Sequence, residues 1–210
     1  MEHALTLDSD GLAIEALMER QSERWGVVIS HPHPLYGGDM TNGVVAAIMN
    51  AYRRCGATTL RFNFRGVGRS QGRYGKGVAE QTDVRAAIDH LAVCGIGRID
   101  LAGYSFGSWV NARAAAAGAP VGAMVMVSPP VAALDFTPID SLDCLGLVLT
   151  GSADEYAPPA AVARSAAHWN SSADLRIIEG ADHFYGARLD TLEAVLFQYL
   201  TSRPDDQGVP

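Results

Sequence analysis

Lysine is almost absent from this chain. Of the 16 basic residues only Lys76 is a lysine, and the formal net charge is −7. The basic residues form no run that could follow a phosphate backbone. A surface of net negative charge repels both nucleic acids and anionic lipid headgroups. We therefore expect neither a nucleic acid nor a membrane as a partner.

Long apolar segments are also missing. The apolar stretch 121–127 is broken by Gly122 and is followed by Ser128-Pro129-Pro130. A helix that spans a bilayer needs about 20 predominantly apolar residues, which no segment here provides. The first residues, Met1-Glu2-His3-Ala4, lack the basic and apolar regions of a signal peptide. These features predict a cytoplasmic protein.

Cysteines are few. Cys55, Cys94 and Cys144 lie far apart, and their number is odd. This pattern argues against a disulfide framework and against a zinc site with paired ligands. We expect buried free thiols, as in a cytoplasmic protein.

Apolar residues are abundant enough for one core. The chain has 210 residues, of which 48% are hydrophobic and 19% charged, and it contains no repeat or linker that would divide it. This length suits one domain. We expect a single domain over residues 1–201 and a disordered tail over 202–210.

Strand and helix patterns alternate along the chain. In the clearest helix, Val84, Ala87, Ile88 and Leu91 recur at helical spacing. An antiparallel strand pair opens the chain. The strands and helices that alternate after this pair imply a mainly parallel, doubly wound α/β sheet flanked by helices. In such sheets the site lies at the carboxyl ends of the strands. The expected strands are 5–7, 12–17, 27–29, 58–64, 99–102, 121–127, 145–150 and 175–178. The expected helices are 39–52, 78–93, an Ala-rich helix that follows residue 107 and ends at 117, 159–169 and 189–200.

The segment Gly103-Tyr104-Ser105-Phe106-Gly107 fits G-x-S-x-G between a predicted strand and a predicted helix. In that context the serine sits on a sharp turn that exposes its hydroxyl above the sheet. The helix N-terminus that follows favours a developing negative charge. A serine that merely caps a helix is the alternative, but the strand–turn–helix context favours Ser105 as a nucleophile.

A serine hydroxyl needs a base at neutral pH, and the base needs an acid to orient it. His183 follows the last predicted strand, and Asp154 follows the strand before it. Both residues therefore lie in strand-end loops, and the acid falls between serine and histidine in chain order. Glu155 and Asp182 are competitors for the role of the acid. The favoured catalytic set is Ser105, His183 and Asp154.

Two backbone N–H groups must stabilise the oxyanion formed in acyl transfer. One is expected from Phe106, the residue after the nucleophile. The other is expected from the loop 31–38, whose two prolines carry no N–H. Within this loop we favour Leu35, with Tyr36 and His33 as alternatives.

Two other patterns in these loops have less specific interpretations. His31 and His33 could share one face of an extended chain and bind a metal, but no third ligand with recognisable spacing is visible. We therefore expect the histidines to brace the loop and the site to hold no metal. The loop 65–72 contains glycines and arginines but is not a phosphate-binding loop of the G-x-x-x-x-G-K type, so a bracing role is favoured here too.

Four motifs together give the chain a family resemblance. They are the loop His31–Gly38, the segment Asn63–Ser70, the serine motif Gly103–Gly107 and the segment Gly180–Phe184. In this order they resemble a small, lidless bacterial branch of the α/β-hydrolase superfamily related to dienelactone hydrolases. The resemblance extends from about residue 25 to residue 200. It implies the α/β-hydrolase fold and no cofactor.

The resemblance also implies a carboxylesterase that acts on small-molecule esters with short acyl groups. Dienelactone hydrolases use a cysteine nucleophile, whereas this chain has Ser105. Only residues 128–144 separate the strands where many relatives insert a helical cap, so there is room for one short helix and no cap domain. We expect an open site, with Tyr36, Tyr156 and Phe184 as substrate-binding residues and Phe106 and Tyr185 as further candidates. A peptidase, a thioesterase or a non-catalytic binding protein on this fold are the alternatives.

Overall fold

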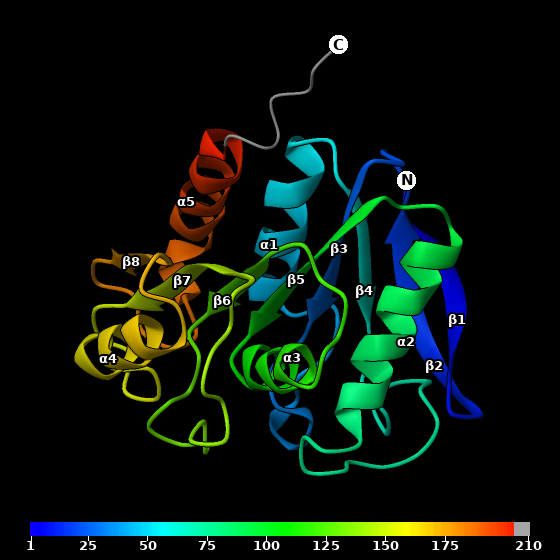
Figure 1. Ribbon diagram of the computed structural model, residues 1–210, viewed down its shortest axis with the longest axis horizontal. Coiled ribbons are helices and arrows are strands. Elements are labelled where there is room, and N and C mark those ends of the chain that lie inside the picture. Colours follow the sequence, from blue (N-terminus) through cyan, green and yellow to red (C-terminus); the bar gives the residue numbers. More distant parts are fainter. Residues whose placement is uncertain (204–210) are drawn as a thin grey trace.

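The computed structural model describes residues 1–203, and its strands form one eight-stranded sheet (Figure 1). The order across the sheet is β1-β2-β4-β3-β5-β6-β7-β8. The pairs β1–β2 and β2–β4 are antiparallel, and all other pairs are parallel. The strands are β1 (His3–Ser9), β2 (Leu12–Glu19), β3 (Trp25–Ser30), β4 (Thr58–Phe62), β5 (Arg98–Tyr104), β6 (Met124–Val127), β7 (Leu145–Gly151) and β8 (Asp174–Ile178). The predicted α/β-hydrolase architecture, a mainly parallel doubly wound sheet, is confirmed.

Helices cover both faces of this sheet. The helices are α1 (Gly43–Arg54), α2 (Glu80–Val93), α3 (Phe106–Ala116), α4 (Pro159–Trp169) and α5 (Leu189–Ser202), with short 3₁₀ turns η1 (Pro34–Tyr36) and η2 (Gly186–Arg188). Helices α1 and α5 pack on one face, and α2, α3 and α4 pack on the other (Figure 1). Neighbouring residues of the central strands serve the two cores alternately: in β5, Leu101 joins the core under α2–α4 and Ala102 joins the core under α1 and α5.

Two helices begin later than the sequence predicts, because side chains bind the amides just before or at their starts. Asn42 accepts a hydrogen bond from the amide of Val44 at 2.9 Å, so α1 begins at Gly43 and not at residue 39. The carboxylate of Glu80 accepts hydrogen bonds from Gly75 and Gly77 at 2.6 and 2.7 Å, and α2 begins at Glu80 and not at residue 78. Both segments are therefore structured turns that precede the helices.

The segment between β6 and β7 contains no cap domain. Residues 128–144 form a series of turns, and neither a helix nor a strand occurs among these described residues. The single short helix for which there was room does not form. The carboxyl ends of the central strands are consequently not covered by an inserted domain.

The C-terminal region differs in part from expectation. Ser202 ends α5, and Arg203 donates a hydrogen bond to the buried carboxylate of Asp100 at 2.8 Å, so these two residues are ordered rather than part of a disordered tail. The remainder of the expected tail, 204–210, lies outside the described residues. Cys55, Cys94 and Cys144 are half-buried rather than buried. No helix within residues 1–203 is both long enough and apolar enough to cross a membrane.

Candidate active site

Ser105 lies on the sharp turn between β5 and α3. Its backbone has φ +52° and ψ −119°, a conformation that non-glycine residues rarely adopt. The two motif glycines make the turn possible: a Cβ at Gly103 would lie 2.6 Å from the amide nitrogen of Ser108, and one at Gly107 would overlap the carbonyl oxygen of Ser30. Hence the sequence motif corresponds to a backbone geometry that leaves no room for side chains beside the serine.

The three predicted side chains meet at the carboxyl edge of the sheet. Nε2 of His183 lies 2.9 Å from Oγ of Ser105, and Nδ1 lies 2.9 Å from both carboxylate oxygens of Asp154. A charged carboxylate only accepts hydrogen bonds, so Nδ1 carries the proton and Nε2 can accept the proton of the serine hydroxyl. This is the arrangement that general-base activation of a hydroxyl requires.

Asp154 is held in its charged form. Its side chain is fully buried, and burial alone would raise its pKa. Hydrogen bonds from His183, Ser128 and the amide of Ala157 outweigh burial, and the pKa of the carboxyl lies below its ordinary value. The neighbouring candidates do not contact the imidazole in this way: Asp182 instead accepts the amides of the two residues that follow His183.

The loops that carry the acid and the base are tied together. The amide of Ala153 donates to the carbonyl oxygen of Ala181 at 2.9 Å, and the amide of Gly180 donates to Oγ of Ser152 at 2.8 Å. The hydroxyl of Tyr104 adds a third bond, donated to the carbonyl oxygen of His183 at 2.8 Å. The spacing of acid and base is thus set by one backbone contact and two side-chain contacts to the backbone.

The loop after β3 uses its amides differently from our expectation. The amide of Leu35 donates to Nδ1 of His33 at 3.2 Å, and the amides of Tyr36 and Gly38 donate to the carbonyl oxygen of His33. The amide of His33 itself has no hydrogen-bond partner within residues 1–203, and neither has that of Phe106. Leu35, our first choice as oxyanion donor, therefore has its N–H engaged, whereas the alternative His33 has its N–H free.

His31 and His33 brace the loops around the serine. Nε2 of the buried His31 accepts the amide of Phe64 at 3.0 Å, and its Nδ1–H donates to the carbonyl oxygen of Pro32. Burial lowers the pKa of His31 to about 4, so its ring is neutral. Since Nδ1 of His33 accepts an amide, its Nε2–H donates to the hydroxyl of Tyr74 at 3.1 Å. Neither ring leaves a nitrogen free for a metal, and no cluster of three or more potential metal ligands occurs within residues 1–203.

Exposed apolar side chains surround the three central residues. The rings of Tyr156 and Phe184 lie 4.8 and 5.6 Å from the imidazole of His183, and they are 48% and 66% exposed. Tyr36 is 87% exposed and packs on His33. Phe106 and Tyr185, by contrast, are buried, so their rings lie below the surface and do not line an open site.

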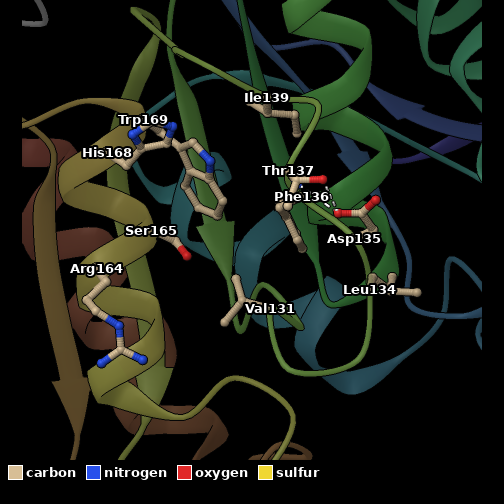
Figure 2. A pocket seen from close by; sticks show the side chains of 10 residues that line it. All are labelled: Val131, Leu134, Asp135, Phe136, Thr137, Ile139, Arg164, Ser165, His168 and Trp169. Atoms are coloured by element: carbon tan, nitrogen blue, oxygen red, sulfur yellow. Dashed lines mark hydrogen bonds between the residues drawn. The ribbon is translucent and has the colours of Figure 1, made fainter.

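A groove of about 430 Å³ lies between α4 and the turns that follow β6 (Figure 2). Its walls include Arg164 and the rings of Phe136 and Trp169, whose centroids lie 5.0 Å apart in a tilted arrangement. None of Ser105, Asp154 and His183 lines it. The predicted triad therefore lies outside this groove.

Sequence reasoning missed three contacts of the site: those of Tyr104, Ser128 and Tyr185. The hydroxyl of Tyr104 donates to the backbone carbonyl of His183, and the hydroxyls of Ser128 and Tyr185 lie 2.8 Å apart. Tyr104 and Tyr185 stand inside the quoted motifs or next to them, but nothing in a motif says which buried hydroxyl meets which partner. Only the position of Ser128 at the end of a predicted strand could have drawn attention to it.

Comparisons with known proteins agree with the fold and with a hydrolase. No family model matches the chain. An uncharacterized protein of Rickettsia prowazekii is 33% identical, over 82% of this chain and 77% of its own length. An alpha-beta serine hydrolase homologue from Coxiella burnetii is 32% identical and superimposes with a TM-score of 0.86, over 94% of this chain and 97% of its own. A lidless α/β serine hydrolase from Xanthomonas campestris is 31% identical with a TM-score of 0.86, over 95% and 94%. With these identities over nearly the whole chain, and with its mainly parallel sheet, the protein belongs to the α/β-hydrolase superfamily.

Proposed function

We propose that the protein is a carboxylesterase that cleaves short-chain acyl esters through an acyl-enzyme intermediate, with Ser105, His183 and Asp154 as its catalytic triad. The observation that carries this proposal is the continuous chain of contacts from the serine hydroxyl through the imidazole to the carboxylate, each 2.9 Å long.

The reaction runs in two steps. Oγ of Ser105 attacks the ester carbonyl carbon while Nε2 of His183 takes its proton, and the carbonyl electrons move onto the oxygen. The tetrahedral intermediate collapses, the ester C–O bond breaks, and the imidazolium returns its proton to the departing alcohol. Water then attacks the acyl-enzyme by the same proton transfers and releases the acid. Asp154 stabilises the imidazolium in both steps.

The oxyanion is stabilised by the amides of Phe106 and His33. Both N–H groups are free of other hydrogen bonds within the described chain, and the two side chains pack with ring centroids 4.9 Å apart. The backbone where β3 leads into the loop 31–38 also lies against the turn that carries Ser105, since a Cβ at Gly107 would overlap the carbonyl of Ser30. Two such donors preorganised near the nucleophile supply a large part of the rate enhancement in acyl transfer.

Tyr156 and Phe184 bind the alcohol portion of the ester. The leaving oxygen must approach Nε2 of His183 to receive its proton, so the group attached to it lies beside the imidazole. Those two exposed rings flank the imidazole, and flat groups can pack against them. Tyr36, on the loop that carries His33, contacts the substrate on the opposite side of the oxyanion site.

The substrate range follows from the lack of a cap. Residues 128–144 add only turns above the sheet, so an acyl chain finds little enclosing surface and short acyl groups suffice. The same triad could serve a thioesterase or a peptidase, because the leaving group is selected outside the triad. A panel of short-chain nitrophenyl esters, acyl-CoA thioesters and aminoacyl amides tests this proposal, and esters are expected to be cleaved fastest.

Labelling with a fluorophosphonate probe separates an enzyme from a non-catalytic binding protein. We expect the folded protein to be labelled and the Ser105→Ala variant not to be. A folded protein that is not labelled would support the binding-protein alternative.

A further inference from the structure

The end of β6 is the point where the segments of all three catalytic residues meet. The carbonyl oxygen of Val127 accepts the amide of Ser105 at 2.9 Å. The amide of the next residue, Ser128, donates to the carbonyl oxygen of Leu149 at 2.7 Å, on the strand that leads to Asp154. Two consecutive residues therefore fix how the end of β5, which carries the nucleophile, and β7, which leads to the acid, are aligned relative to each other.

The side chain of Ser128 reaches the third segment. Its Oγ lies 2.8 Å from the hydroxyl of Tyr185, two residues after His183, and both side chains are fully buried. Ser128 is also among the hydrogen-bond donors that lower the pKa of Asp154. Either hydroxyl of this pair can donate to the other, and the pair links the end of β6 to the segment that follows His183.

Both residues are held in a backbone conformation that costs energy. Ser128 has φ +47° and Tyr185 has φ +56°, and they join Ser105 among the five non-glycine residues with positive φ within residues 1–203. Glycine occupies ten other positive-φ positions in that range, and it adopts this conformation without steric cost. Strained residues persist where surrounding contacts over-determine them, which is common at functional sites. At these two positions glycine would adopt the positive φ at a lower steric cost than serine or tyrosine. The presence of the two larger residues points to a role of their hydroxyls.

We propose that Ser128 and Tyr185 are positioning residues whose paired hydroxyls hold Asp154 and His183 in line with Ser105. This proposal rests on the proposed function, because it assigns the pair a role in the same triad. Neither side chain is exposed, so neither touches the substrate. Their removal should therefore lower kcat and leave KM nearly unchanged.

The test compares Ser128→Ala, Tyr185→Phe and the double variant. Ser128→Ala leaves a buried tyrosine hydroxyl without its partner, so its Tm should fall, whereas the double variant removes both partners and its Tm should recover. We expect kcat to fall about 10-fold in all three, as for other residues that orient a catalytic group. Ser9→Ala is the matched control: its buried hydroxyl donates to the buried Asp83 at 2.7 Å and accepts from Arg65, neither of which belongs to the triad, and kcat should stay at the wild-type value.

The double variant decides between positioning and a merely structural role. If kcat recovers together with Tm, or if kcat is unchanged in all three variants, the proposal is overturned. The proton NMR signal of His183 Nδ1–H reports the contact with Asp154 without any substrate, and we expect it to shift or broaden in the three variants. An unchanged signal in all three would also overturn the proposal. A wild-type protein that gives this signal, altered in the variants, but hydrolyses no ester would instead refute the proposed function alone.

Discussion

The amide of Leu35 donates a hydrogen bond to Nδ1 of His33 at 3.2 Å, and this contact fixes the tautomer of the imidazole. Because Nδ1 accepts, Nε2 carries the proton and donates to the hydroxyl of Tyr74 at 3.1 Å. The side chain of His33 thereby connects the loop after β3 to the loop before α2. The loop after β3 leaves the amide of His33 without a hydrogen-bond partner in the described chain. The ring of His33 packs against that of Phe106, where α3 begins.

The first prediction concerns the acid. Asp154→Asn should leave the fold intact and lower kcat by about 10⁴-fold, because an amide can favour the wrong tautomer of His183 and cannot stabilise the imidazolium. Glu155→Gln is the matched control, since the neighbouring carboxylate is exposed and should be dispensable. Steady-state hydrolysis of a nitrophenyl ester measures both. A large loss in the Glu155 variant, with activity retained in the Asp154 variant, would reverse the assignment.

The second prediction concerns the oxyanion donor. His33 has φ −58°, which proline can adopt, so His33→Pro removes the amide hydrogen without forcing the backbone. His33→Ala removes the imidazole but keeps the amide. We expect kcat of the proline variant to lie about 100-fold below that of the alanine variant.

Leu35→Pro is the comparison for this loop, and it should retain kcat within a few-fold of Leu35→Ala. The assignment of His33 would be wrong if the proline penalty appeared at Leu35 and not at His33.

The third prediction concerns the alcohol portion of the substrate. Benzyl acetate and cyclohexylmethyl acetate have similar leaving groups, but only the first presents a flat ring. We expect a higher kcat/KM for benzyl acetate, by about 2–10-fold, as an aromatic contact of about 0.5–1.5 kcal/mol would give. Tyr156→Ala and Phe184→Ala should reduce this preference while leaving ethyl acetate nearly unaffected. Val93→Ala, an exposed apolar residue on α2, serves as the control and should change neither ester. Equal rates for the two bulky esters in the wild type would count against the two rings.

The fourth prediction concerns stability in acid. The pKa of buried His31 falls from 6.5 to about 4 on folding. Between these values the unfolded chain binds a proton here and the folded chain does not, so the free energy of unfolding falls as the pH falls. The full loss, reached below pH 4, is about 3 kcal/mol. Above pH 6.5 this group contributes no pH dependence.

Denaturant unfolding at pH 7, 5 and 4 measures the effect of His31. His31→Gln should show a smaller loss of stability from pH 7 to pH 4 than the wild type, whereas His168→Gln, on the exposed end of α4, should show the same loss. An identical pH dependence in the wild type and the His31 variant would contradict a buried neutral ring.

The sequence predicts most elements of this fold, because apolar periodicity depends only on which face of a strand or helix is buried. The helical spacing of Val84, Ile88 and Leu91 corresponds to buried positions of α2, and α4 has the bounds that were expected. Helix starts are less predictable. Asn42 and Glu80 decide where α1 and α2 begin through contacts with nearby amides, and apolar periodicity carries no information about such contacts.

The candidate site likewise has features that the sequence predicts and features that depend on side-chain contacts. The sequence by itself determined the elbow and its glycines, and the chain order of Ser105, Asp154 and His183 at strand ends, because parallel strands bring their carboxyl ends to one edge of the sheet. Only the tertiary structure decided which amide of the loop after β3 is free, since that depends on where the side chain of His33 turns. It also decided that Ser128 meets Tyr185, 57 residues away, because such a contact arises only when the folded sheet brings the loops after β6 and β8 together.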